Sequence, residues 1–392
     1  MKLIISRLSK ALPIMLLGCF ICIVSLNSHA TKSAIKPNVL FIYPVGKGFP
    51  FWDSQVDFAQ AVAKALDIQL DIAYPPVEFR NRFNAAAYIS EQLDKKEQLP
   101  DMLITSFWLG SEEKIMSLLQ EKNIDLISIN SDISPSQYLQ LGKPRERFSR
   151  WLATLSPNDT LAGKLLAKSI IQSSRKIRCP LEDCRVNIFA ISGLSYSAVS
   201  KQRIVGLERM VYQDRQSRLL NIVFGNWDRQ LVASMVPKIL SRHQDIHAYW
   251  VASDVMAYGI EDGLNQQQLN LPSNTIIGGI DWSAPTIDKI RSGEMQVSVG
   301  GHFLEAGWSL ILYYDYINGA DFADELGTII KTQMSVLNKD NIELLGPFLQ
   351  SPSWSTTMIK KYSKQLNPAR QSYNLNPQQL ILEHSKAQVL LQ

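Results

Sequence analysis

The chain has 392 residues, of which 46% are hydrophobic and 19% are charged, and 40 basic residues slightly outnumber 36 acidic ones. A chain of this length exceeds one ordinary hydrophobic core, so we expect two lobes. The near balance of charge argues against a nucleic-acid partner, because binding to phosphate backbones requires a strongly basic surface.

The N-terminal 30 residues have the pattern of a secretory signal peptide that is cut after Ala30. Basic residues precede an apolar run from 11 to 26, and the small residues Ser28 and Ala30 flank the expected cleavage position. A retained membrane anchor is one alternative, although the run is short for a bilayer span. A lipoprotein box at Gly18-Cys19 is another, although the apolar run continues beyond Cys19. We therefore expect an exported protein located in the periplasm.

The cysteines fit an exported protein. Cys19 and Cys22 fall in the leader, which leaves Cys179 and Cys184 on either side of a short loop. In an oxidising compartment such a pair predicts a disulfide. A metal site would need further Cys or His ligands nearby, and the sequence has none there.

Strand-like and helix-like segments alternate along the chain from residue 39. This alternation with short links predicts an α/β fold with doubly wound parallel sheets, and the number of strands predicts two sheets of similar size. The strand-like segments are 39–43, 68–73, 102–105, 126–129, 151–155, 186–191, 219–224, 248–252, 276–281 and 296–300. The helix-like segments are 52–66, 83–93, 111–121, 159–172, 198–213, 229–241, 256–265, 284–292 and 303–317.

Two segments interrupt this alternation. Residues 134–150 are polar, contain Pro135, Gly142 and Pro144, and predict an inserted loop beside a lobe crossing. From 351 onward the chain becomes polar and rich in Gln and Asn, which indicates an extension whose order the sequence does not predict.

Catalytic motifs are not found in the sequence. His243 and His247 are four residues apart, but only Asp245 accompanies them, so a surface pair is a better interpretation than a metal site. There is no nucleophile elbow and no Walker A loop, and the glycine pair at 278–279 lacks the third glycine of a dinucleotide loop. We therefore expect neither an enzyme nor a bound cofactor or metal.

Polar and aromatic residues follow the strand-like segments, at the edge where open α/β sheets bind ligands. Phe51, Trp52 and Asp53 open the helix after the first strand. Either the rings only pack this helix on the core, or one ring stacks on a sugar-like ligand while Asp53 accepts a hydroxyl. Each further candidate alone is typical of a helix cap or a surface, but together they predict a cleft for a small polyhydroxy ligand. These further candidates are Ser106, Asn130, Asp132, Ser192, Arg203, Asp254 and Asp281.

Six motifs follow one another in order between residues 37 and 345. They are Phe49-Pro-Phe-Trp52, Arg203-Ile-Val-Gly206, Gly225-Asn-Trp-Asp-Arg229, Ala252-Ser-Asp-Val-Met-Ala-Tyr-Gly259, Gly278-Gly-Ile-Asp281 and Leu337-Asn-Lys-Asp-Asn-Ile342. With these motifs the chain resembles type I periplasmic binding proteins of the sugar-binding class, the ribose- and galactose-binding group. Trp52, Asn130, Arg203 and the insertion after Asn130 also resemble the autoinducer-2 receptors of the same superfamily.

The resemblance implies two Rossmann-like lobes, joined by a three-crossing hinge, that close on a ligand. The implied N-terminal lobe is 37–131 plus about 302–330, the C-terminal lobe is about 132–301 plus about 331–350, and 351–392 is a polar extension. Asn130 would lie where the first crossing begins. Phe51 and Trp52 would stack on the ligand, Arg203, Asp254 and Asp281 would bind hydroxyls, and Trp227 of the third motif would also contact it.

The chain departs from the family at the third crossing. Sugar binders commonly have a Gln there and the autoinducer-2 receptors an Arg, whereas this chain has Gly301 followed by His302. The departure removes a polar contact and makes ribose, galactose and the borate-bridged autoinducer weaker candidates. Either His302 replaces the lost group, or the pocket accepts a larger ligand.

The expected function is that of an exported solute-binding protein, which captures a sugar or sugar-like ligand between its lobes and presents it to an inner-membrane ABC importer. The alternative is a periplasmic sensor, similar to the autoinducer-2 receptors, that docks onto a membrane kinase or cyclase. The insertion at 134–150 and the extension after 351 would supply extra docking surface for a sensor.

Overall fold

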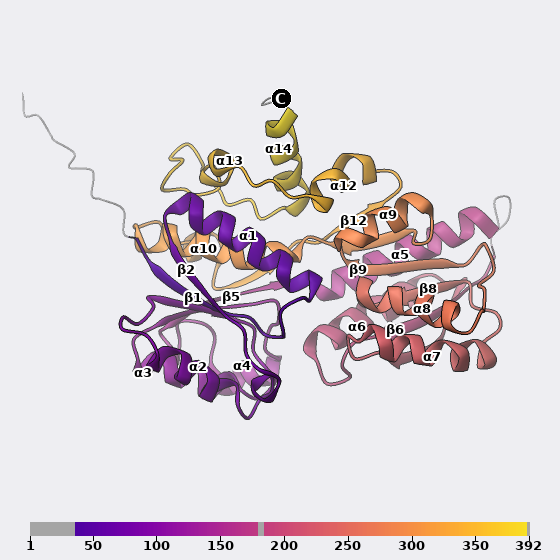
Figure 1. Cartoon of the computed structure of the whole chain (residues 1–392), viewed down its shortest axis with the longest axis horizontal. Coiled ribbons are helices and arrows are strands. Elements are labelled where there is room, and N and C mark those ends of the chain that lie inside the picture. The colour runs from indigo at the N-terminus through magenta and orange to yellow at the C-terminus, as the bar shows by residue number, and fades with distance from the viewer. Residues whose placement is uncertain (1–35, 179–183, 390–392) are drawn as a thin grey trace, which may run out of the picture. The chain divides into compact units, whose positions relative to one another are not determined.

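The computed structural model describes residues 36–178 and 184–389, which fall within one unit from Ile35 to Gln392 (Figure 1). The expected signal peptide and Cys179 of the expected disulfide lie outside the described residues. In the part of the chain that the structure describes, no helix is both long enough and apolar enough to cross a membrane.

The first sheet has six parallel strands in the order β11-β5-β4-β3-β1-β2. Side chains that alternate along β1 pack into two different cores, because successive residues of a strand face opposite sides. Val39 and Phe41 join the core under α1 and α10, and Leu40 and Ile42 join the core under α2 and α3 (Figure 1). The strands are β1 (Asn38–Ile42), β2 (Gln69–Ala73), β3 (Met102–Thr105), β4 (Asp125–Ile129), β5 (Trp151–Pro157) and β11 (Ile329–Thr332).

The second sheet has the order β12-β10-β9-β8-β6-β7, and only the β10–β12 pair is antiparallel. Gly278 and Gly279 of β9 permit close packing, because a Cβ at Gly278 would lie 2.7 Å from Leu166 and one at Gly279 would lie 2.2 Å from Asp254 Oδ1. The strands are β6 (Val186–Ser192), β7 (Ser217–Phe224), β8 (Ala248–Val251), β9 (Ile276–Asp281), β10 (Val297–Gly300) and β12 (Ser335–Asn338).

Helices cover both faces of each sheet, as the alternation of strands and helices predicted. The helices of the first lobe are α1 (Pro50–Leu66), α2 (Ala85–Asp94), α3 (Glu112–Glu121), α4 (Pro135–Leu141), α10 (Glu305–Ile317) and α11 (Ala323–Leu326), with the 3-10 turn η1 (Val77–Phe79). Those of the second lobe are α5 (Asp159–Arg178), α6 (Ala198–Gln213), α7 (Arg229–Arg242), α8 (Asp254–Gln266), α9 (Ala284–Ser292) and α12 (Ile342–Gln350). The 3-10 turn η2 (His302–Leu304) precedes α10, and α13 (Thr356–Lys360) and α14 (Pro377–Val389) lie in the C-terminal extension.

The chain passes between the two sheets three times, which confirms the three-crossing hinge. The crossings follow β5 at Asn158, β10 at Gly301 and β11 at residues 333–334. The first crossing therefore differs from the boundary expected near 132, and Asn130 does not begin it. After β4 the chain instead returns to the first sheet as β5.

Burial of Trp151 explains why the chain returns to the first sheet. The indole of Trp151 is 1% exposed and its Nε1 donates to Ser128 Oγ of β4 at 3.1 Å. The preceding segment, 134–150, is not only a loop, because a capping box between Ser134 and Gln137 begins α4. Its polar composition predicted an inserted loop, whereas Leu141 and Phe148 of this segment are buried in the core of the first lobe.

Within the described residues, the C-terminal extension packs on the body of the protein. Its side chains Tyr362, Tyr373, Leu380 and Ile381 belong to the same buried core as Phe58 of α1. The sequence did not predict this packing because these few apolar residues are separated by Gln, Asn and Ser.

Candidate functional site

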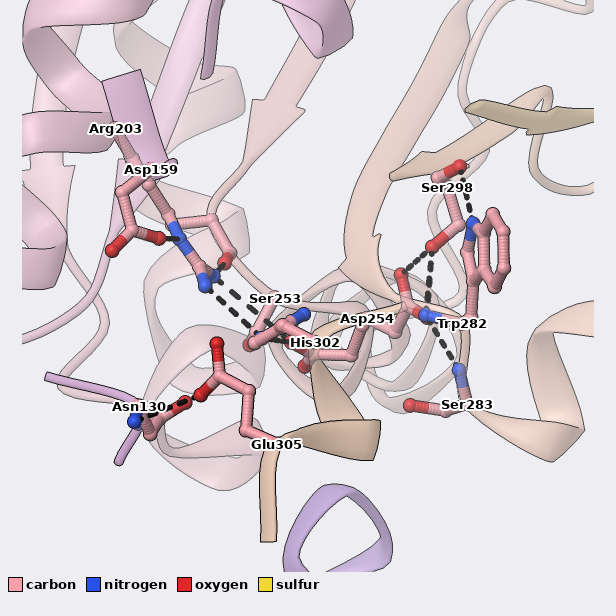
Figure 2. A network of polar contacts seen from close by, with 12 residues as sticks. Asn130, Asp159, Arg203, Ser253, Asp254, Trp282, Ser283, Ser298, His302 and Glu305 are labelled. Atoms are coloured by element: carbon pink, nitrogen blue, oxygen red, sulfur yellow. Dashed lines mark hydrogen bonds and ion pairs between the residues drawn. The ribbon is translucent and has the colours of Figure 1, made fainter. Parts of the chain in front are cut away.

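Arg203 lies at the centre of a buried polar cluster between α5, α6 and the second crossing (Figure 2). Its side chain is 3% exposed, and its Nε donates to Asp159 Oδ1 at 2.8 Å. Its Nη1 donates to the carbonyl oxygen of Ala252 at 2.6 Å. These two bonds fix the plane of the guanidinium, because its N–H groups form a rigid fork.

Two glycines bring Arg203 and Asp159 together. A Cβ at Gly163 would lie 2.0 Å from the carbonyl oxygen of Arg203, and a Cβ at Gly206 would lie 2.1 Å from that of Thr160. Helices α5 and α6 therefore approach more closely than larger residues would permit. Asp159 is in the first turn of α5, where a carboxylate is also favoured by the helix dipole.

His302 is 1% exposed and presents its Nε2 to Nη2 of Arg203 at 3.3 Å. Because a guanidinium only donates, Nε2 accepts in this contact and the ring proton lies on Nδ1. Burial, together with the charge of Arg203, lowers the pKa of His302 well below its ordinary value, so the ring is neutral. Nδ1 has no hydrogen-bond partner among the described residues, which leaves a buried donor available.

Asp281 faces the same two groups at the carboxyl end of β9. Its Oδ1 lies 3.6 Å from Nε2 of His302 and 4.0 Å from Nη1 of Arg203. Burial raises the pKa of Asp281 well above its ordinary value, and the charge of Arg203 opposes the rise. Asp281 can therefore offer a hydroxyl donor when protonated or a carboxylate acceptor when ionised.

Aromatic rings adjoin the polar cluster from both lobes. The ring of Phe51 lies against that of His302, with centroids 4.4 Å apart and an interplanar angle of 32°. The ring of Phe51 also packs edge-on against that of Trp52, with ring centroids 5.3 Å apart. The guanidinium carbon of Arg203 lies 5.7 Å from the centre of the Trp227 ring. A Cβ at Gly193 would lie 2.0 Å from that indole, so only glycine leaves space for Trp227 in this position.

Several residues around the cluster have backbone conformations that residues other than glycine rarely adopt. Trp227 has φ of 63°, Asp281 of 138°, Trp282 of 61° and Asn130 of 63°. Each such residue costs on the order of 1–3 kcal/mol and tends to occur at functional sites.

Asn130 contacts the start of α10 through its backbone. Its N–H donates to Glu305 Oε2 at 2.8 Å, and the hydroxyl of Thr332 donates to Glu305 Oε1 at 2.5 Å. Glu305 is fully buried, and burial raises its pKa well above the ordinary value. The carboxyl group thus connects the ends of β4 and β11 to the start of α10.

Asp53 and Ser106 are not part of the polar cluster. Asp53 Oδ1 accepts from the hydroxyl of Tyr43 at 2.8 Å, close to the ring of Trp52. Ser106 is buried just after β3, and no hydrogen bond among the described residues links its side chain to Arg203.

Asp254 is close in sequence to the site, but its carboxylate is occupied elsewhere. It is fully buried and lies between Ser298 and Ser283 (Figure 2). Its Oδ2 accepts from the N–H of Ser283 at 3.0 Å and from the hydroxyl of Thr286 at 2.9 Å, and its Oδ1 accepts from Ser298 Oγ at 2.8 Å. Asp254 therefore fixes the start of α9 to β10 rather than facing Arg203.

The sequence did not identify Asp159 and Glu305 as parts of the site. Asp159 is the first residue of an expected helix, where an acidic residue is common. Glu305 lies within another expected helix among apolar and small residues, so the sequence did not distinguish it. Asp132 and Ser192 were also among the candidates at strand ends. Asp132 accepts from Tyr138 and Lys331, whereas Ser192 is buried at the end of β6 with no partner for its hydroxyl among the described residues. Within residues 36–178 and 184–389, no three His, Cys, Asp or Glu side chains are grouped as metal ligands would be.

Comparison with known proteins places the chain among binding proteins. A family model described as periplasmic binding protein domain matches residues 39–320. No curated protein matches the chain.

Solved structures with the same fold include a periplasmic sugar-binding protein from Pseudomonas fluorescens, with 23% identity, a TM-score of 0.73, and coverage of 88% of this chain and 99% of that one. A periplasmic solute-binding protein of an ABC transporter from Actinobacillus succinogenes, with bound D-allose, has 16% identity and a TM-score of 0.65 over 79% of this chain and 99% of that one. A similar protein from Bacillus halodurans, with bound myo-inositol, has 13% identity and a TM-score of 0.63 over 81% of this chain and 99% of that one.

Proposed function

Because the chain belongs to the periplasmic binding protein family, we propose that it binds a sugar or sugar-like polyol beside Arg203 and His302 and delivers it to an ABC importer. One observation carries this proposal. Phe51 of the first lobe and Arg203 of the second both contact His302, which lies on the crossing between the lobes. A ligand that contacts this group would touch both lobes and the hinge.

The chemistry of the cluster favours a neutral ligand rich in hydroxyl groups. The charge of Arg203 is already balanced by Asp159, so a strongly charged ligand would leave an unpaired buried charge. Nδ1 of His302 offers a donor, and Asp281 offers a carboxyl group. The rings of Phe51, Trp52 and Trp227 supply apolar faces on which the C–H face of a sugar ring can pack.

Lobe closure would couple binding to delivery. A ligand held by both lobes stabilises the closed form in proportion to its preference for that form, and a membrane partner can then recognise closure rather than the ligand. We place the protein in the periplasm, since the family is periplasmic and the leader predicts export. No catalytic step is required of any residue in this account.

A periplasmic sensor that docks onto a membrane kinase or cyclase is the second candidate function. One observation favours it: the insertion at 134–150 is built into the first lobe and exposes Leu139, which is 90% accessible on α4. Copurification from membranes separates the candidates, because permease subunits support import and a receptor protein supports sensing.

Thermal-shift screening of the protein against pentoses, hexoses, polyols and furanones tests the proposed ligand class. A ligand of the native state raises the melting temperature by mass action. We expect at least one sugar or polyol to raise it in a concentration-dependent way, and we expect His302→Ala to reduce that rise. A panel in which only non-carbohydrate ligands stabilise the protein would contradict the proposal.

A further inference from the structure

The C-terminal segment, residues 351–389, contacts elements of both lobes (Figure 1). Trp354 lies between an aromatic residue of each lobe. Its ring centroid is 4.4 Å from that of Phe58 on α1 and 4.8 Å from that of Phe348 on α12. The ring centroid of His384 on α14 lies 5.3 Å from that of the same indole. One cluster of rings, in which Trp354 is partly buried, therefore joins α1, α12 and the segment.

A buried carboxylate attaches the segment to the first lobe. Asp315 of α10 is fully buried and accepts from the hydroxyls of Ser363 and Tyr373, at 2.5 Å and 3.0 Å. It also accepts from the backbone N–H of Lys364 at 2.7 Å and of Gln365 at 3.2 Å. Four hydrogen bonds from the segment converge on this one buried carboxyl group, so the attachment is firm.

The start of α14 lies against two of the three crossings. A Cβ at Gly301 would lie 2.3 Å from Cγ of Pro377, so the proline ring sits directly on the glycine that precedes His302. Gly301 has φ of 115°, a conformation that favours glycine. The neighbouring Asn376 donates from its side-chain amide to Oε1 of Gln333 at 3.2 Å, at the third crossing.

We propose that residues 351–389 form a hinge clamp, in which Pro377 and Asn376 position the second and third crossings and thereby fix His302. Hinge motion requires backbone torsions to change at a few crossing residues. A segment packed on Gly301 and bonded at Gln333 opposes such changes. Pro377 is a positioning residue in this account, since it acts through Gly301 and not on a ligand.

The clamp has a consequence for binding that rests on the proposed function. The apparent affinity of a ligand depends on how much of the protein already has the binding-competent arrangement. Loosening the clamp should lower that fraction, so a sugar that binds the wild type should bind the loosened protein several-fold more weakly.

Hydrogen exchange on the full-length, ligand-free protein tests the clamp directly. The variants are Pro377→Ala, which removes Cγ, the Pro377 atom that lies nearest the position of a Cβ at Gly301, and Asn376→Ala, which removes the bond to Gln333. Ser372→Ala is the matched control, because Ser372 is exposed in the same segment. In Pro377→Ala, we expect the amides of residues 299–305 to exchange at least about threefold faster than in the control. In Asn376→Ala, we expect the same increase for the amides of residues 331–336.

Equal exchange in all three variants at these crossings would overturn the proposal. Faster exchange spread over every strand would also overturn it, since that result indicates general destabilisation. The measurement needs no ligand, so it remains informative if no sugar binds and the proposed function fails. If a sugar does bind the wild type, unchanged affinity in Pro377→Ala would remove the link between the clamp and His302.

Discussion

Arg203 and Asp159 form a buried ion pair in which both side chains are less than 5% exposed and Nε lies 2.8 Å from Oδ1. Burial raises the pKa of Asp159, while the charge and hydrogen bond of Arg203 oppose that rise. The pair orients the guanidinium toward His302, so the position of the polar cluster depends on a residue that need not touch a ligand.

Asp159→Asn should destabilise the protein and weaken binding together. Removing one partner of a buried ion pair leaves an uncompensated charge, so the free energy of unfolding should fall by about 3 kcal/mol or more. Asp262→Asn is the control, because its pair with Arg229 is partly exposed and should be worth under about 1 kcal/mol. Urea denaturation checks both, and equal losses in the two variants would contradict the assigned role of the buried pair.

Asp254→Ala should affect stability more than it affects ligand affinity. The change leaves the N–H of Ser283 and the hydroxyls of Thr286 and Ser298 without their acceptor, which should cost about 3 kcal/mol or more. The sequence predicted the opposite balance, with Asp254 as a contact to the ligand. Calorimetric titration measures the ligand affinity of the variant, and thermal unfolding measures its stability. A large loss of affinity with an unchanged melting temperature would instead indicate that Asp254 contacts the ligand.

His302→Gln should reduce the dependence of stability on pH below neutrality. Burial lowers the pKa of His302 in the folded protein, whereas the unfolded chain binds a proton near the ordinary value of 6.5. The contribution of His302 to stability is therefore fully present above pH 6.5 and is lost as pH falls below that value.

The pKa values of Asp281 and Glu305 are raised and act in the opposite direction, so the comparison with the wild type isolates the histidine. Denaturation midpoints measured from pH 7 to about pH 5 should fall less steeply in His302→Gln. Parallel curves for the two proteins would show that His302 is not buried and neutral.

Much of the fold could be predicted from the sequence because buried parallel strands are short apolar runs. Ile276–Asp281 is such a run, and the structure gives β9 the predicted bounds. The first crossing was placed wrongly because polar residues with Pro and Gly are typical of a linker. The burial of Trp151 against Ser128 returns the chain to the first sheet, and no local sequence pattern indicates this burial.

The site was predictable only in part. Strand ends could be located, so Arg203, Asp281 and Phe51 were recognised as candidates, and the structure brings all three to His302 or its immediate neighbours. The direction of a side chain at a helix start could not be predicted, so the sequence did not indicate that Asp254 bonds to α9 and β10 or that Asp159 bonds to Arg203. Aromatic residues such as Trp354 gave no signal within a Gln-rich segment, because what they pack against lies about 300 residues earlier in the chain.

Isothermal titration of the best stabilising sugar into wild type, Phe51→Ala and Phe83→Ala determines whether the ligand binds beside His302. Phe51 lies against His302, whereas Phe83 is 69% exposed after η1 and serves as the aromatic control. We expect Phe51→Ala to weaken binding by about tenfold or more and Phe83→Ala to leave it unchanged. Wild-type affinity in Phe51→Ala would contradict a ligand site beside His302.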